Sequence, residues 1–126
     1  MNIGDCFINE PAHDLPRHLW IIISDPDVDP GNILIVNVTS WRDFHDQACV
    51  LNPGDHERIH EKSCVNYPAA KVTSAAVLQD AFDKRLVHAQ PPCRQDILNR
   101  ILQGAYLSDE IKGMHKKLLR DQGLID

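Results

Sequence analysis

Hydrophobic residues in the first part of the chain come in short runs separated by Pro, Gly and Asp, a pattern typical of strands and turns. The two strongest runs cover residues 18–24 (HLWIIIS) and 32–38 (NILIVNV), and both are rich in the β-branched residues Ile and Val. The stretch DPDVDPG between them has the composition of a turn. Four weaker strands are predicted at residues 4–9, 47–52, 63–67 and 70–74. Residues 1–74 are therefore predicted to be β-rich.

The spacing of apolar residues changes to a helical period after residue 74. A first helix is predicted to follow an N-cap at Ser74 or Thr73, a second to follow Cys93, and a third to open at Ser108. Gly104 is a candidate end of the second helix, because glycine often terminates helices. The expected buried faces consist of Ala76, Leu78, Ala81 and Phe82, then Ile97, Leu98, Ile101 and Leu102, then Ile111, Met114 and Leu118.

The length of 126 residues is typical of a single domain with a substantial core. We therefore expect one α+β domain over residues 1–126, with helices from residues 75–126 packed on the β-rich part. No apolar run approaches the roughly 18 residues that span a bilayer, so no membrane association is expected. The N-terminus resembles no signal peptide, and the four cysteines follow no regular spacing. These features predict reduced thiols and a cytoplasmic location.

The formal net charge of −5 is unevenly distributed along the chain. Residues 1–74 carry five Lys and Arg against eleven Asp and Glu, whereas residues 75–126 carry eight against seven. A protein covered by basic patches is therefore excluded. Any nucleic-acid site in the β-rich part must be local and built from a few Arg and His side chains.

Polar side chains stand at the outer ends of the two strongest strands. An antiparallel hairpin centred near Val28 would pair Trp20 with Val36 and place Arg17 beside Thr39. Directly opposed residues lie about 5 Å apart at Cβ. We therefore expect a guanidinium and a hydroxyl to meet where the apolar part of the hairpin ends.

This pairing of side chains suits a phosphate group, because Arg offers several donors in a fixed fork and Thr adds a short-reach hydroxyl. In RNA cleavage the 2′-hydroxyl attacks the adjacent phosphorus, and a positioned Arg stabilises the growing negative charge. The reaction also needs a proton donor or acceptor near pH 7, usually His. His18 is adjacent to Arg17, and three further histidines lie in loops that we expect near the site: His13, His56 and His60.

The order of these residues resembles that of the MazF/PemK-like (Kid-like) toxins of type II toxin–antitoxin systems. The resemblance covers roughly residues 3–75 and consists of Gly4-Asp5, a loop ending in Arg17, the strand LWIIIS, and a second apolar strand closing on Thr39-Ser40. It implies a small SH3-like antiparallel β-barrel, with C-terminal helices packed on it. His18 replaces the Pro that usually follows the Arg in this family.

The resemblance also implies an activity and partners. It implies a metal-independent endoribonuclease that needs no cofactor and cuts single-stranded RNA to 2′,3′-cyclic phosphate and 5′-hydroxyl ends. It further implies a homodimer that is neutralised by a cognate antitoxin protein. By position, Arg17 carries over as the residue that binds the phosphate and stabilises the transition state, Thr39 as its partner, and Ser40 as a further contact.

The remaining candidate residues follow from their side-chain chemistry. His18 or His56 would move protons in the reaction. Trp41 could stack on a base just beyond Ser40, and His56, Arg58 and His60 could form a basic rim that contacts RNA phosphates.

Two other functions remain open at this stage. The acidic charge balance favours a non-catalytic SH3-like binding module. The four-residue spacing of His45 and Cys49, and of His56, His60 and Cys64, would instead suit a zinc-binding protein.

Overall fold

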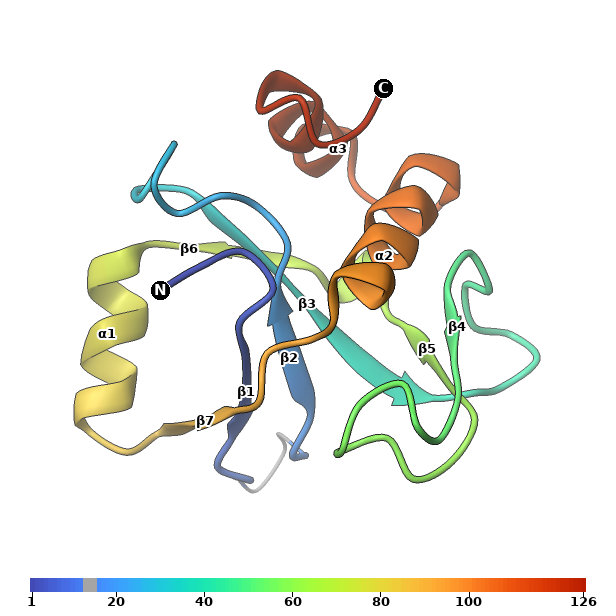
Figure 1. Ribbon diagram of the computed structural model, residues 1–126, viewed down its shortest axis with the longest axis horizontal. Coiled ribbons are helices and arrows are strands. Elements are labelled where there is room, and N and C mark those ends of the chain that lie inside the picture. Colours follow the sequence, from blue (N-terminus) through green and yellow to red (C-terminus); the bar gives the residue numbers. More distant parts are fainter. Residues whose placement is uncertain (13–15) are drawn as a thin grey trace.

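The computed structural model describes residues 1–12 and 16–126 and has an α+β architecture (Figure 1). The strands are β1 (Cys6–Asn9), β2 (Leu19–Ile22), β3 (Ile33–Ser40), β4 (Val50–Leu51), β5 (Ser63–Val65), β6 (Lys71–Thr73) and β7 (Val87–Gln90). The helices are α1 (Ala75–Asp83), α2 (Gln95–Leu107) and α3 (Gly113–Asp121), and a short 3-10 turn, η1 (Tyr67–Ala69), precedes β6. The six predicted strands and three predicted helices are all present. β7 was not predicted.

The described strands form one antiparallel sheet in the order β4-β5-β3-β2-β1-β7. β3 is long enough to pair with two strands along one edge, with β6 beside its first half and β5 beside its second half. The expected closure into an SH3-like barrel is wrong, because no ladder joins β4 to β7 in the described part of the chain. β4 has only two residues, and the loop after it reaches β7 through side chains rather than through a backbone ladder.

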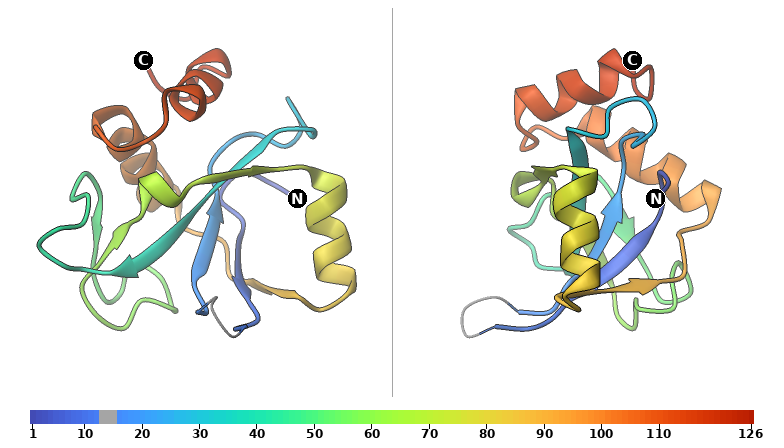
Figure 2. Two further views of the ribbon diagram at one scale, coloured as in Figure 1. Left: turned by 180° about the vertical axis from the view of Figure 1, so that it is seen from behind. Right: turned by 90° about the vertical axis from the view of Figure 1, so that its left-hand side faces the viewer.

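Both faces of the sheet are buried at the β2–β3 hairpin, and successive side chains along each strand point to opposite faces. Ile21 and Val36 point into the larger core with α2, whereas Trp20 and Ile35 point into a smaller core with Leu78 of α1. Figures 1 and 2 show α1 and α2 on opposite sides of the β2–β3 hairpin. The sheet is therefore the middle layer at this hairpin, which explains its nearly continuous apolar sequence.

The register of the β2–β3 hairpin differs by one residue from the prediction. Ile21 pairs with Val36 and Ile22 with Ile35, whereas the predicted hairpin pairs Trp20 with Val36. Opposed residues in an antiparallel pair lie on the same face of the sheet. The observed register is the one that keeps Ile21 and Val36 together in the α2 core, and Ile22 and Ile35 together in the α1 core.

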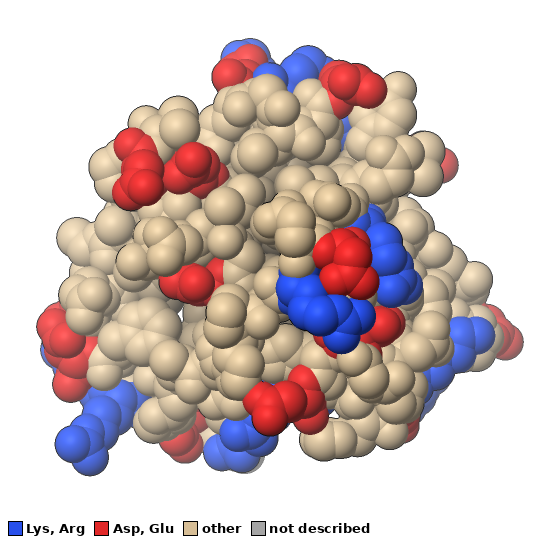
Figure 3. All heavy atoms as spheres, viewed as in Figure 1, with Lys and Arg blue, Asp and Glu red and all other residues tan. Residues whose placement is uncertain are grey.

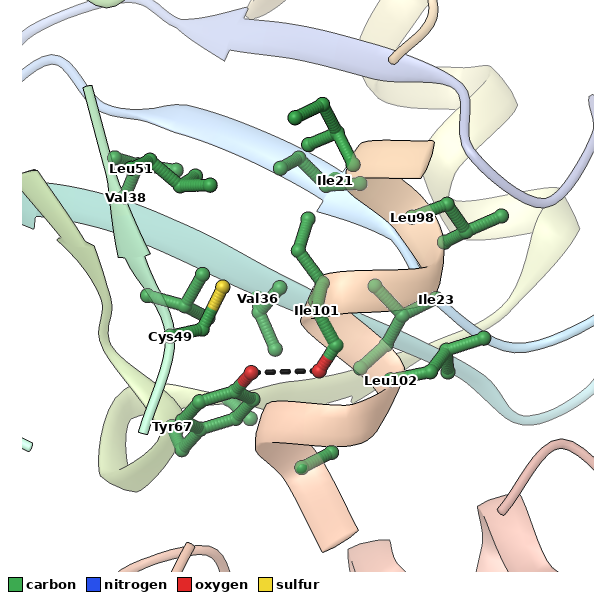
Figure 4. Close-up of a cluster of buried hydrophobic side chains, with 14 of the residues drawn as sticks. Ile21, Ile23, Val36, Val38, Cys49, Leu51, Tyr67, Leu98, Ile101 and Leu102 are labelled. Carbon is green, nitrogen blue, oxygen red and sulfur yellow. Dashed lines mark hydrogen bonds between the residues drawn. The ribbon is translucent and has the colours of Figure 1, made fainter. Parts of the chain in front are cut away.

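Gly104 lies inside α2 rather than at its end, because the helix continues to Leu107. The absence of a side chain at Gly104 allows α2 to pack closely against Tyr67 and Cys49. A Cβ at this position would lie 2.3 Å from the Tyr67 hydroxyl oxygen and 2.8 Å from the Cys49 Cβ. Figure 4 shows this contact region, where the Tyr67 hydroxyl donates a 2.6 Å hydrogen bond to the carbonyl of Ile101.

The third helix begins at Gly113, later than Ser108, where the sequence predicted its start. Ser108 instead caps a turn, in which its hydroxyl oxygen accepts hydrogen bonds from the N–H groups of Glu110 and Ile111. This shift turns Met114 outward, with 71% of its surface exposed, whereas His115 and Leu119 are buried. The prediction of Met114 in the buried face was therefore wrong.

Within the described residues, none of the helices has the length and apolar character needed to cross a bilayer.

Candidate functional site

A cavity of about 390 Å³ opens where the β2–β3 hairpin ends and the loop before β5 passes over it. Three segments line it. The segment leading into β2 contributes Arg17, His18 and Leu19, the end of β3 contributes Val38, Thr39 and Ser40, and residues 58–63 contribute Arg58, Ile59, His60, Glu61 and Ser63. Two arginines, two histidines and three hydroxyl groups thus share one concave surface.

Six of the eight residues that the sequence singled out line this cavity: Arg17, His18, Thr39, Ser40, Arg58 and His60. The other two, His56 and Trp41, do not line it. His13 lies outside the described residues.

The predicted register places Arg17 directly opposite Thr39. In the structure these residues are not directly opposed, but both line the same cavity. The observed ladder ends with Leu19 opposite Val38, so its continuation would place His18 next to Thr39, and Arg17 next to Ser40. Both residues stay at the same end of the hairpin, because a slip of one residue moves a side chain along the strand by only about 3.4 Å.

Asn9 at the end of β1 holds the backbone on both sides of Arg17. Its side-chain oxygen accepts hydrogen bonds from the N–H of His18 (2.9 Å) and the indole N–H of Trp20 (3.0 Å). Its amide nitrogen donates to the carbonyls of Glu10 (3.1 Å) and Pro16 (3.2 Å). Sequence reasoning missed this residue. The available signal was an Asn next to a Pro-containing loop, since Asn side chains commonly bind local backbone groups.

The Arg17 guanidinium itself is only loosely held. Its Nη2 lies 3.9 Å from a Glu10 carboxylate oxygen, and both side chains are about half exposed. Exposed pairs of this kind contribute little to stability. The Arg17 side chain is therefore able to turn toward an anion in the cavity.

His18 is oriented by a contact to β3. Its Nδ1 lies 3.2 Å from the carbonyl oxygen of Val38. A carbonyl only accepts hydrogen bonds, so Nδ1 carries a proton and the neutral ring has its basic nitrogen at Nε2. This tautomer suits a general base.

His56 was expected to move protons, and the structure does not support that role. Its Nδ1 accepts the N–H of Arg58 at 3.0 Å, and its Nε2 donates to the carbonyl of Pro91 at 2.7 Å. Both ring nitrogens are therefore engaged, and 8% of the residue is exposed. His56 instead fastens the loop that carries Arg58 to the segment after β7.

The Arg58 side chain reaches the last residue of β7, since its Nε donates to the Gln90 amide oxygen at 2.6 Å. Two further arginines hold the loop from the other side. Arg94 donates to the carbonyl of Gly54 at 3.0 Å, and Arg100 pairs with Asp55 at 3.4 Å. Arg58 and His60 thus stand on a loop fixed by contacts distant in sequence.

Trp41 lies just beyond Ser40 but outside the cavity lining. The ammonium of Lys62 lies 4.1 Å from the centre of its ring and covers one face. Its buried indole N–H has no hydrogen-bond partner among the described residues. A base could stack on that face of Trp41 only if Lys62 moved.

The electrostatics of the cavity are mixed. Glu61 accepts a hydrogen bond from the Ser40 hydroxyl, so a carboxylate lies among the arginines. Figure 3 shows positive and negative side chains next to each other on the face viewed there, with no broad positive field. The positive charge of Arg17 and Arg58 is therefore a local feature, as the sequence composition required.

The residues proposed as zinc ligands do not form a metal-binding cluster in the described part of the chain. The described residues include no group of three or more His, Cys, Asp or Glu side chains placed to hold a metal ion. His45 contacts Cys64 at 3.8 Å through Nδ1, while that nitrogen also binds the carbonyl of Ser40 at 3.1 Å. His56 is occupied as described above.

No protein-family model matches the chain, and a search of the curated proteins gives no match either.

Proposed function

We propose that this protein is a metal-independent endoribonuclease of the MazF/PemK-like toxin type, and that it cuts single-stranded RNA in the cavity between residues 17–19, 38–40 and 58–63. One observation carries the proposal. Two arginines and two histidines from separate segments converge on one cavity with Thr39 and Ser40, in an otherwise acidic half of the chain.

In the proposed reaction the scissile phosphate lies between Arg17 and Arg58, with the Thr39 hydroxyl donating to a non-bridging oxygen. His18 Nε2 takes the proton of the 2′-hydroxyl as this oxygen bonds to phosphorus. The bond to the 5′-oxygen breaks, and protonated His60 gives that oxygen its proton. The products are a 2′,3′-cyclic phosphate and a 5′-hydroxyl. The arginines stabilise the charge that develops on the non-bridging oxygens.

The test is cleavage of an unstructured RNA oligonucleotide by the purified protein in the presence of EDTA, with the product ends identified. We expect cyclic phosphate and 5′-hydroxyl ends. An oligonucleotide with 2′-deoxyribose at the scissile position should stay intact, because it lacks the nucleophile. Absence of cleavage by folded protein would overturn the proposal and favour the binding module, and loss of cleavage only with EDTA would overturn metal independence.

Variants separate the roles of the residues. Arg17→Ala and Arg58→Ala should each lower the cleavage rate about 100-fold or more, the loss typical of removing one group that stabilises a transition-state charge. Arg120→Ala is the matched control, because Arg120 lies on α3 and contacts Asp126 instead of the cavity. Equal rates for Arg17→Ala and wild type would remove Arg17 from the mechanism.

The proposal includes two partners, which the family resemblance alone supports. These are a second copy of the chain in a homodimer and an antitoxin protein that blocks the cavity. Light scattering of the purified protein tests the first. The proposed antitoxin predicts that co-expression with a small acidic protein, encoded beside the gene for this protein, suppresses the RNA cleavage.

A further inference from the structure

Two cysteine thiols lie together where β1 begins and where the chain enters α2. The carbonyl oxygen of Gly4 accepts hydrogen bonds from the Cys6 thiol at 3.4 Å and from the Cys93 N–H at 3.0 Å. A Cβ on Gly4 would lie 3.7 Å from the Cys93 sulfur, so this sulfur lies close to the backbone two residues before Cys6. Cys93 also packs against the buried cluster that contains Cys6.

The members of this pair differ in a way that suits oxidation. Cys93 is partly exposed, whereas 3% of Cys6 is exposed. The neighbouring Cys6 thiol lowers the pKa of Cys93, and the same contact together with burial raises the pKa of Cys6. Cys93 is thus the more accessible and more readily ionised thiol of the pair, and Cys6 is a thiol held next to it. Oxidation-sensitive cysteines commonly have this arrangement of a reactive and a resolving thiol.

The other two cysteines provide the contrast. Cys49 and Cys64 are both buried. Burial raises the pKa of Cys49 to about 11 and also raises the pKa of Cys64. Neither thiol is therefore disposed to react with an oxidant in the folded protein.

We propose that Cys6 and Cys93 are a modification site that forms a reversible disulfide on exposure to a peroxide. The Cys93 thiolate attacks one oxygen of the peroxide, the O–O bond breaks, and hydroxide takes a proton and leaves as water. The Cys6 sulfur then attacks the sulfur of the resulting sulfenic acid and loses its proton, and a second water leaves. Two thiols are oxidised and one hydrogen peroxide is reduced to two waters.

The Cys6–Cys93 disulfide would link β1 to the segment that anchors the loop carrying Arg58 and His60. Gln90 and Pro91, which hold Arg58 and His56, lie three and two residues before Cys93, respectively. Oxidation would thus restrict the movement of Gln90 and Pro91, which anchor the loop of residues 52–62 between β4 and β5. This consequence for the cavity rests on the proposed function, whereas disulfide formation itself does not.

The test treats the reduced protein with hydrogen peroxide, denatures it, and counts the thiols that still react with N-ethylmaleimide. We expect two alkylated cysteines in place of four, a Cys6–Cys93 linked peptide by mass spectrometry, and recovery of all four on reduction. The thermal midpoint should rise by about 5–15 °C, because the bond closes a long loop in the unfolded chain. Four alkylated cysteines after treatment would overturn the proposal, as would any other pairing.

Variants make the assignment specific. Cys93→Ser should abolish peroxide-dependent loss of thiols, and Cys6→Ser should leave Cys93 to oxidise to sulfenic and then sulfinic acid. Cys64→Ser is the control and should still form the linked peptide. Sulfinic acid on Cys93 of wild-type protein, without the linked peptide, would show that Cys6 is not a resolving thiol. No RNA enters this experiment, so its outcome is separate from that of the cleavage assay.

Discussion

The contact of α2 with the sheet provides the sharpest test of the packing, through the substitution Gly104→Ala. In an exposed helix interior this change stabilises a protein by about 1 kcal/mol. At this position the new Cβ would lie 2.3 Å from the Tyr67 hydroxyl and 2.8 Å from the Cys49 Cβ. Both neighbours are buried, with Tyr67 0% exposed and Cys49 5% exposed. One of them must move, or the helix must shift.

The expected cost follows from what each movement breaks. Displacing the Tyr67 hydroxyl removes its 2.6 Å hydrogen bond to Ile101 and leaves a buried polar group unpaired, at about 1–3 kcal/mol. The Cys49 Cβ cannot rotate away, because it is bonded to the backbone, so overpacking adds about 1–3 kcal/mol. After the gain in helix propensity, we expect a net loss of about 3 kcal/mol. The melting temperature should fall by roughly 10 °C.

Urea denaturation followed by tryptophan fluorescence measures this change. Gly113→Ala is the matched control, because Gly113 is also helical and a Cβ there would meet nothing within 4 Å. It should be neutral or slightly stabilising. Tyr67→Phe removes the closest atom, so Gly104→Ala should cost less in that background than in wild type. If Gly104→Ala is as stable as wild type, the close approach of α2 to η1 is incorrect.

Two further predictions concern buried polar groups. Asn9→Ala should lower the unfolding free energy by about 2 kcal/mol, because it leaves the N–H groups of His18 and Trp20 without their acceptor, and an unchanged urea midpoint would contradict this. Burial, with a contribution from Lys112, lowers the pKa of His115. The unfolded chain therefore binds a proton more readily there, and stability should fall as pH drops through about 6.5 toward 5. The variant His115→Leu should show a smaller loss over this range, and an equal loss would exclude His115 as its source.

The sequence predicted β1, β2 and β3 well because they are almost fully buried and consist of apolar runs between turn residues. β7 escaped prediction for the opposite reason. It is an edge strand with sequence VHAQ, paired only with β1 in the described sheet, and its residues are half-buried or exposed. No apolar pattern marks such a strand. Gly104 was misread because glycine suits both a helix end and a close approach, and only the position of Tyr67 distinguishes the two.

The candidate site was partly predictable for a related reason. Arg17, Thr39 and Ser40 lie at strand ends, so predicting the strands was enough to bring them to one end of the hairpin. Arg58 and His60 were proposed from their side-chain chemistry, but the direction of their loop was not predictable. It depends on Gln90 and Pro91, which lie more than 30 residues later in the chain.

The one-residue error in register shows which part of the site the sheet determines. A slip of this kind exchanges the two faces of a strand, so it would remove a site built from side chains within the ladder. Arg17 and Arg58 both lie outside the ladders, on segments held by Asn9 and by Gln90 with His56. The sheet therefore sets the position of the cavity, whereas these polar anchors hold the two segments that carry its arginines. Phosphate affinity should then depend on the anchors as well as on the arginines themselves, because a bound anion must be met by both at once.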